Sequence, residues 1–125
     1  MIYVFANDDR GLTAYASEAE AISACEGVDV EDGNYRFFSS GGQPLLPRIT
    51  RPTTRGFGVV TSGLYELRND TTPTSADLTS LLSQVTYVEG CGLTNVADVV
   101  ARMESHANAS AYVPSNKSLE RTGEG

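Results

Sequence analysis

The sequence has no tryptophan, a single histidine and two cysteines among its 125 residues. Structural zinc sites use four Cys or His ligands, and His106, Cys25 and Cys91 supply only three. No metal site and no cofactor are therefore expected. The two cysteines lie 66 residues apart, without the Cys-x-x-Cys spacing of a redox pair. Two reduced, buried cysteines are the favoured interpretation, and a disulfide between them is the alternative.

Long hydrophobic runs are also absent. No stretch approaches the roughly 18–20 consecutive apolar residues of a membrane-spanning helix. Met1 leads directly into strand-like residues, without the charged, apolar and small-residue regions of a signal peptide. We therefore expect a cytoplasmic protein that has no membrane partner.

Large apolar residues are scarce, since Leu, Ile, Val and Phe together number 28. A chain of this length forms one domain, because domains typically contain roughly 100–200 residues. We expect a single compact domain over residues 1–113 and a polar C-terminal tail over residues 114–125. So small a stock of core residues also favours a homodimer, because association adds stability to a marginal fold.

Basic residues are few, and the net charge is −7. Proteins that coat DNA or RNA are basic, so no nucleic-acid partner is expected. The charge is unevenly divided along the chain: residues 1–35 carry −7, residues 36–68 carry +4 and residues 69–125 carry −4. The middle segment is thus the one basic part of an acidic protein.

Three arginines of this segment, Arg48, Arg51 and Arg55, lie close together in a stretch rich in threonine. A planar guanidinium suits carboxylates and phosphates, because it donates two parallel hydrogen bonds. One interpretation is therefore a binding site for an anionic small molecule. The other is that these arginines pair with the acidic N-terminal third or stay in solvent. No Gly-Lys-Ser/Thr signature indicates a Walker-type phosphate loop.

Runs of β-branched and aromatic residues bounded by turn residues predict strands at residues 2–6, 12–15, 35–38, 45–50 and 57–67. Pro44 and Pro47 lack a backbone donor, so the strand that contains them is expected either to lie at an edge of the sheet or to be irregular. Gly63, inside the last run, is either a turn or a bulge. The Arg55 to Phe57 region is expected to pass from loop into strand.

Three helices are expected, each with a polar cap. Ser17 and Glu20 have the spacing of a capping box, and Asn95 and Asp98 repeat it at the last helix. The middle helix is expected to begin near Thr74 and end at Gly90, with an apolar stripe formed by Leu78, Leu81, Leu82, Val85 and Val88. Strands come early and helices mostly late, so the predicted fold is α+β: an antiparallel sheet of four to five strands with three helices packed mainly on one face.

No catalytic constellation is visible. His106 has no nucleophile or orienting acid marked beside it, and a helix-end surface position is favoured. The acidic stretch at residues 29–34 fails the calcium-loop pattern, because its glycine and its twelfth residue do not match. Strand aromatics are more numerous than one small core needs, and Tyr35 and Phe57 are candidate partner-binding residues. Phe37 and Phe38 are neighbours, so they must face opposite sides of the sheet.

The C-terminal sequence Ser-Asn-Lys-Ser-Leu-Glu-Arg-Thr-Gly-Glu-Gly, residues 115–125, resembles the translated end of an integron gene cassette. The resemblance implies a cassette-encoded bacterial protein in which the tail takes no part in the core. It implies no fold, and no functional residue follows from it.

These observations favour a non-catalytic binding or interaction module that forms homo-oligomers. One alternative is a small enzyme or pocket protein that binds an anionic molecule through Arg48, Arg51 and Arg55. Another is an acidic inhibitor or immunity-like protein, because negative charge steers a protein toward basic partners.

Overall fold

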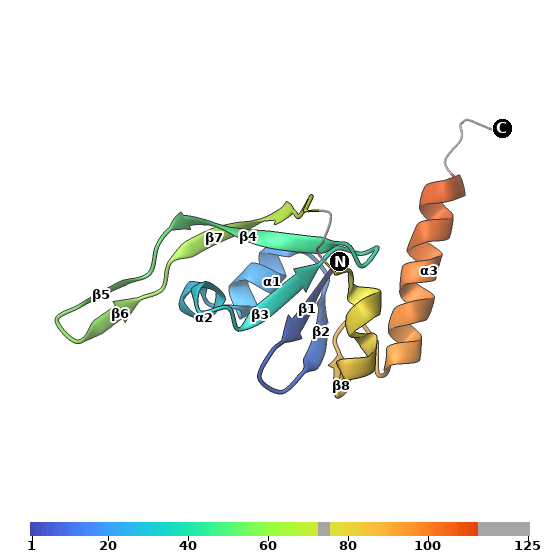
Figure 1. The fold of residues 1–125 in the computed structure, drawn as a ribbon, viewed down its shortest axis with the longest axis horizontal. Coiled ribbons are helices and arrows are strands. Elements are labelled where there is room, and N and C mark those ends of the chain that lie inside the picture. The colour runs from blue at the N-terminus through green and yellow to red at the C-terminus, as the bar shows by residue number, and fades with distance from the viewer. Residues whose placement is uncertain (73–75, 113–125) are drawn as a thin grey trace.

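A computed structural model describes residues 1–72 and 76–112 as a mixed α+β fold (Figure 1). Six strands form one sheet in the order β7-β4-β3-β1-β2-β8, and two further strands form a separate two-stranded sheet. The elements are β1 (Ile2–Ala6), β2 (Gly11–Tyr15), α1 (Glu18–Ala24), α2 (Gly27–Glu31), β3 (Tyr35–Phe38), β4 (Pro44–Arg51), β5 (Thr54–Gly56), β6 (Val59–Thr61), β7 (Leu64–Asn69), the 3-10 helix η1 (Leu78–Gln84), β8 (Tyr87–Glu89) and α3 (Val96–Tyr112).

The large sheet has more strands than expected, and it is not wholly antiparallel. The first five strands of the order pair antiparallel, whereas β8 pairs parallel with β2 through Leu12 and Val88. This β2–β8 pairing joins segments that are far apart in the chain, so no local turn signal announces it. The expected sheet of four or five antiparallel strands was wrong in these two respects.

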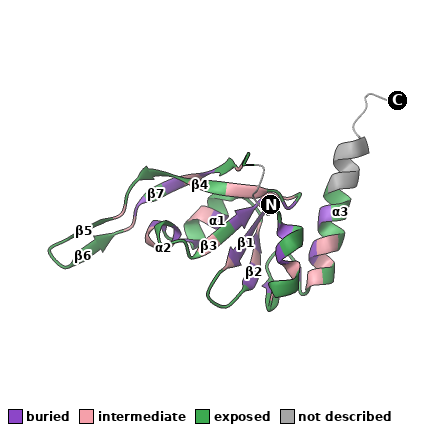
Figure 2. Cartoon of the chain, in the orientation of Figure 1, coloured by how far each residue is buried: buried purple, intermediate pink, exposed green. Residues whose placement is uncertain are grey.

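Helices cover both faces of the sheet, not mainly one. One core lies against η1 and α3 and includes Tyr3, Phe38 and Val99. The other lies against α1 and α2 and includes Val4 and Phe37. Phe37 and Phe38 therefore point to opposite faces, and both are buried. Two cores explain how one short chain buries aromatic residues on both sides of β3 (Figure 2).

The caps of the first and last helices match the predictions. Ser17 is the N-cap of α1, and its hydroxyl accepts from the Glu20 amide at 3.2 Å. At α3, the Asn95 side chain accepts from the Asp98 amide at 2.9 Å. A side-chain acceptor satisfies one of the free amides of the first turn, which fixes where a helix begins.

The middle helix differs from the prediction. Residues 78–84 form a 3-10 helix capped by Asp77, and Tyr87–Glu89 then form strand β8. The apolar stripe is still buried at Leu78, Leu81 and Val88, but by two different elements. Thr74, the expected cap, and the expected tail over residues 114–125 lie outside the described residues.

The proline-containing strand β4 does not lie at an edge, because β3 and β7 pair with its two sides. It is irregular, which was the other alternative, because its register shifts between Ile49 and Arg51. Its pairing with β3 covers only Phe37 with Leu45 and Phe38 with Pro44. The next hydrogen-bonded pair outward on this side, Tyr35 with Pro47, would need a backbone donor at Pro47, which has none. Strands β3 and β4 consequently separate beyond Leu45, while β4 stays paired with β7 from Leu45 to Arg51, apart from Thr50.

Candidate functional site

The β4–β7 pair extends beyond the body of the protein into a hairpin, which we call the arm and define as residues 52–63 (Figure 1). Its two strands, β5 and β6, pair only with each other, through Thr54–Thr61, Arg55–Val60 and Gly56–Val59. All six residues of the two strands are exposed. Figure 2 shows the arm as a mostly exposed projection at one end of the molecule.

Two residues, Phe57 and Gly58, make the tip of the arm. Both have left-handed backbone conformations, with φ of +51° and +75°. Positive φ at both central residues is the type I′ arrangement of two-residue hairpins, which favours Asn-Gly and similar pairs. A bulky residue is unusual there, because its Cβ approaches the following carbonyl oxygen. The Phe57 ring is also fully exposed, so no contact within the chain compensates for this strain.

The root of the arm is held by α2. The Glu31 carboxylate accepts from the Thr53 amide at 2.7 Å and from the Thr53 hydroxyl at 2.5 Å. The Gly63 amide donates to the Thr53 hydroxyl oxygen at 2.9 Å. This hydrogen bond joins the two sides of the hairpin at the base of the arm. Gly27 of α2 lies against Gly63 so closely that a Cβ on Gly27 would stand 2.1 Å from the Gly63 carbonyl oxygen.

Gly63 is therefore neither the turn nor the bulge that the sequence left open. It is a buried close-approach point between β6 and β7. The irregularity lies instead on β4, where the register shifts between Ile49 and Arg51. One extra residue, Thr50, is accommodated there, and bulges of this kind bend a strand and increase its twist. The bulge and the glycine contact together direct the arm away from the sheet.

The bulge also brings the arginines of β4 to one face. Arg48 pairs across the strands with Glu66, and Arg51 pairs with Leu64. Paired residues share a face, and Tyr65 and Leu67 point to the opposite side, into the α1–α2 core. Without the extra residue, Arg48 and Arg51 would alternate to opposite faces.

Two more arginines lie on that side of the sheet. Arg68 lies opposite Leu46 on the β4–β7 pair, and Arg36 lies opposite Phe5 of β1. We define the arginine face as Arg36, Arg48, Arg51 and Arg68. No residue of the core beneath η1 and α3 comes from β4 or β7, so the outer part of this face is left uncovered.

Most of these arginines lack an acidic partner in the described part of the chain. The Arg68 Nε lies 2.7 Å from the Glu66 Oε1. This hydrogen-bonded ion pair, with a smaller effect of the Arg48 charge, lowers the pKa of the Glu66 carboxyl. No other described arginine lies within 4.0 Å of a described carboxylate. Arg55 lies on the arm, opposite Val60, and is therefore not part of the six-stranded sheet that carries Arg48 and Arg51.

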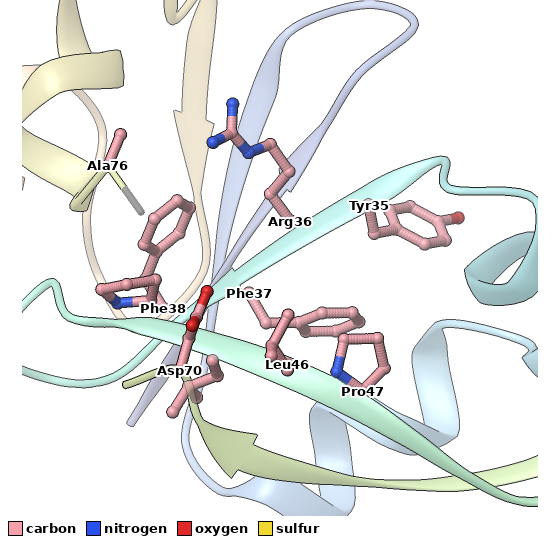
Figure 3. Close-up of a pocket in the computed structure, with 10 residues that line it drawn as sticks. Tyr35, Arg36, Phe37, Phe38, Leu46, Pro47, Asp70 and Ala76 are labelled. Atoms are coloured by element: carbon pink, nitrogen blue, oxygen red, sulfur yellow. The ribbon is translucent and has the colours of Figure 1, made fainter. Parts of the chain in front are cut away.

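A shallow pocket of about 180 Å³ occupies the wedge where β3 and β4 separate (Figure 3). Tyr35, Arg36, Phe38 and Pro47 line it together with Asp70. Figure 3 shows the Arg36 side chain extending away from Asp70. The wedge thus carries charges of both signs. Tyr35 packs against Phe37 with ring centroids 6.4 Å apart.

Possible reactive groups are few in the described residues. Cys25 is buried, and burial, aided by the Asp29 charge, raises the pKa of its thiol to about 11. The thiolate is the nucleophilic form, so Cys25 is unreactive at neutral pH. Cys91 is exposed, and the two cysteines are free. The expectation of two buried cysteines was therefore right for Cys25 and wrong for Cys91, and His106 is exposed within α3.

Among the described residues, no group of three or more His, Cys, Asp and Glu side chains is arranged to hold a metal ion. In the same residues, no helix is both long enough and apolar enough to cross a membrane. No family model, curated protein or solved structure matches the chain.

Proposed function

We propose that this protein is a non-catalytic binding module that self-associates through the arm and forms homo-oligomers. One observation carries the proposal: seven large apolar side chains are exposed in the described residues, and six of them lie between residues 46 and 64. Phe57, Val59 and Val60 lie on the arm, Ile49 and Leu64 lie beside its root, and Leu46 lies farther along β4. Scattered exposed apolar residues are ordinary on a protein surface, whereas a concentration of them marks an interaction site.

The construction of the arm supports the same function. An isolated two-stranded hairpin is at best marginally stable in water, so an exposed arm gains order by docking. Both outer edges of the β5–β6 pair also carry free backbone groups, which another chain can pair with. The Glu31–Thr53 hydrogen bonds orient the arm beforehand, which reduces the entropy lost on binding. A reducing compartment such as the cytoplasm suits the two free thiols.

Light scattering coupled to gel filtration tests the proposal. At about 50 µM, the wild-type chain is expected to elute as a dimer or larger assembly, and the Phe57→Ala, Val60→Thr double variant as a monomer. The matched control is Tyr87→Ala, which removes the one exposed large apolar side chain that the structure describes outside residues 46–64. A monomeric wild type overturns the proposal. So does an assembly that only Tyr87→Ala dissociates, because the contact would then lie at the β8 edge.

A second candidate function is the binding of an anionic small molecule by Arg48 and Arg51, with Arg55 on the adjoining arm as a third candidate contact. The specific observation is that the Thr50 bulge places Arg48 and Arg51 on one open face, and neither forms an ion pair within 4.0 Å with a described carboxylate. Thermal-shift measurements with phosphorylated and carboxylated metabolites test it. A ligand that raises the melting temperature of the wild type, but not of the Arg48→Ala, Arg51→Ala variant, supports this function. No shift with any anion rejects it.

A further inference from the structure

We infer that the arm docks on a second copy of this chain, with Phe57 inserted into the groove between η1 and α3 and Arg55 facing Glu104. This inference rests on the proposed function and adds the receiving surface. It begins from Phe57, whose ring is fully exposed in a backbone conformation that disfavours bulky side chains. An outlier of this kind at an exposed tip points to a functional contact.

The receiving surface is a groove of about 250 Å³ lined by Gly41, Thr79, Leu82, Val100, Met103 and Glu104, which we call the η1–α3 groove. Its floor is apolar, and a methionine in such a floor adapts to the shape of an inserted ring. An apolar cavity of roughly 150 Å³ is large enough to bind benzene, so the groove has room for a phenyl group. Met103 is buried, while Glu104 is exposed and stands beside the groove.

Charge selects a second copy as the occupant. Arg55 lies two residues before Phe57, and neither Arg55 nor Glu104 has an ion-pair partner among the described residues. The arm belongs to the one basic segment, with +4 over residues 36–68, while the segments before and after it carry −7 and −4. Each copy thus offers a basic arm and an acidic body, and complementary potentials favour their encounter.

The shape of the molecule allows two copies to dock their arms on each other in a closed dimer. The arm and α3 lie at opposite ends of the long axis, so an arm cannot reach the groove of its own chain (Figure 1). A second copy related by a two-fold axis perpendicular to that long axis has its α3 beside the first copy's arm. Two identical contacts then form, and the dimer is closed instead of growing into a filament.

Sedimentation velocity of the full-length chain over a range of concentrations tests the inference. Arg55→Glu and Glu104→Arg are each expected to weaken the dimer at least tenfold, and the double variant is expected to return to within threefold of the wild type. Glu89→Arg is the control charge reversal, because Glu89 lies on β8 away from the groove, and it must not rescue Arg55→Glu. Val100→Gln is expected to weaken the dimer without touching the arm.

The outcomes separate this inference from the proposed function. A dimer that Phe57→Ala dissociates, but that is indifferent to Glu104→Arg and Val100→Gln, overturns the η1–α3 groove as the receiving surface and leaves the arm as the contact. A dimer indifferent to Phe57→Ala overturns both. A wild-type chain that remains monomeric at 100 µM also overturns both.

Discussion

Replacing Phe57 with asparagine should stabilise the monomer while weakening its self-association. The φ of +51° at Phe57 belongs to the left-handed region, which costs an ordinary residue roughly 1–2 kcal/mol. Asparagine adopts this region far more readily, and Asn-Gly is the preferred pair for a type I′ turn. The Phe57 ring makes no buried contact, so the substitution removes strain and loses no packing.

The expected gain is about 1 kcal/mol, which for a chain of this size corresponds to a rise of about 4 °C in Tm. Thermal unfolding followed by circular dichroism measures it, at a protein concentration low enough for both chains to be monomeric, because dimerisation itself raises Tm. Phe57→Ala is the control: it removes the ring but keeps a Cβ in the left-handed conformation, so its Tm should stay close to the wild-type value.

A destabilisation of more than about 1 kcal/mol by both substitutions would refute this reasoning, because the ring would then be packed within its own chain. Stabilisation by asparagine together with loss of the dimer is the trade-off expected where a functional residue occupies a strained position.

Four further predictions concern the body of the protein. Tyr3→Phe should raise the free energy of unfolding by about 1 kcal/mol in urea titrations, because the buried Tyr3 hydroxyl lacks a hydrogen-bond partner among the described residues. Gly27→Ala should lower it by about 1–3 kcal/mol through its clash with Gly63, whereas Gly56→Ala, where a Cβ meets open space, should change it little. A thiol reagent at pH 8 should modify one cysteine, Cys91, within minutes, and Cys25 only after unfolding, because burial raises the pKa of the Cys25 thiol. Hydrogen bonds from the Thr94 amide and hydroxyl lower the pKa of the Asp98 carboxyl. The ionised Asp98 therefore stabilises the fold at neutral pH, and this stabilisation is lost as the pH falls through the acid range. Asp98→Asn should flatten the fall in unfolding free energy that is measured between pH 6 and pH 3.

Local signals in the sequence predict much of the fold. Strands at residues 2–6 and 35–38 have dense β-forming composition, and Ser17 and Asn95 mark where two helices begin. These features depend on neighbours within four residues, which is the range over which capping and side-chain alternation act.

Pairing between distant segments is what the sequence does not reveal. The apolar stripe from Leu78 to Val88 fits a helix. Val88 instead lies on a strand and pairs with Leu12, more than seventy residues earlier in the chain. The 3-10 helix before it also brings residues three apart, Leu78 and Leu81, to one face. A three-residue spacing therefore fits either type of helix.

The candidate site was predictable only in part. Counting charges along the chain identifies the basic segment, and Phe57 is recognisable as an aromatic residue with an unassigned role. The Thr50 bulge, which decides that Arg48 and Arg51 share a face, leaves no local signature. Phe57 was expected within a strand and instead lies in a tight turn. The sequence did not reveal this turn, because Phe-Gly lacks the polar first residue by which such turns are usually recognised.

Hydrogen–deuterium exchange at two protein concentrations tests most directly whether the arm is the contact surface. At concentrations where the chain is monomeric, the backbone amides of β5 and β6 should exchange rapidly, because this exposed hairpin has no core of its own. Above the dimerisation concentration, these amides should become protected, together with those of η1 and α3, while the amides of β1 should not change. Unchanged exchange in the arm of a chain that sedimentation shows to be dimeric would contradict the proposed function.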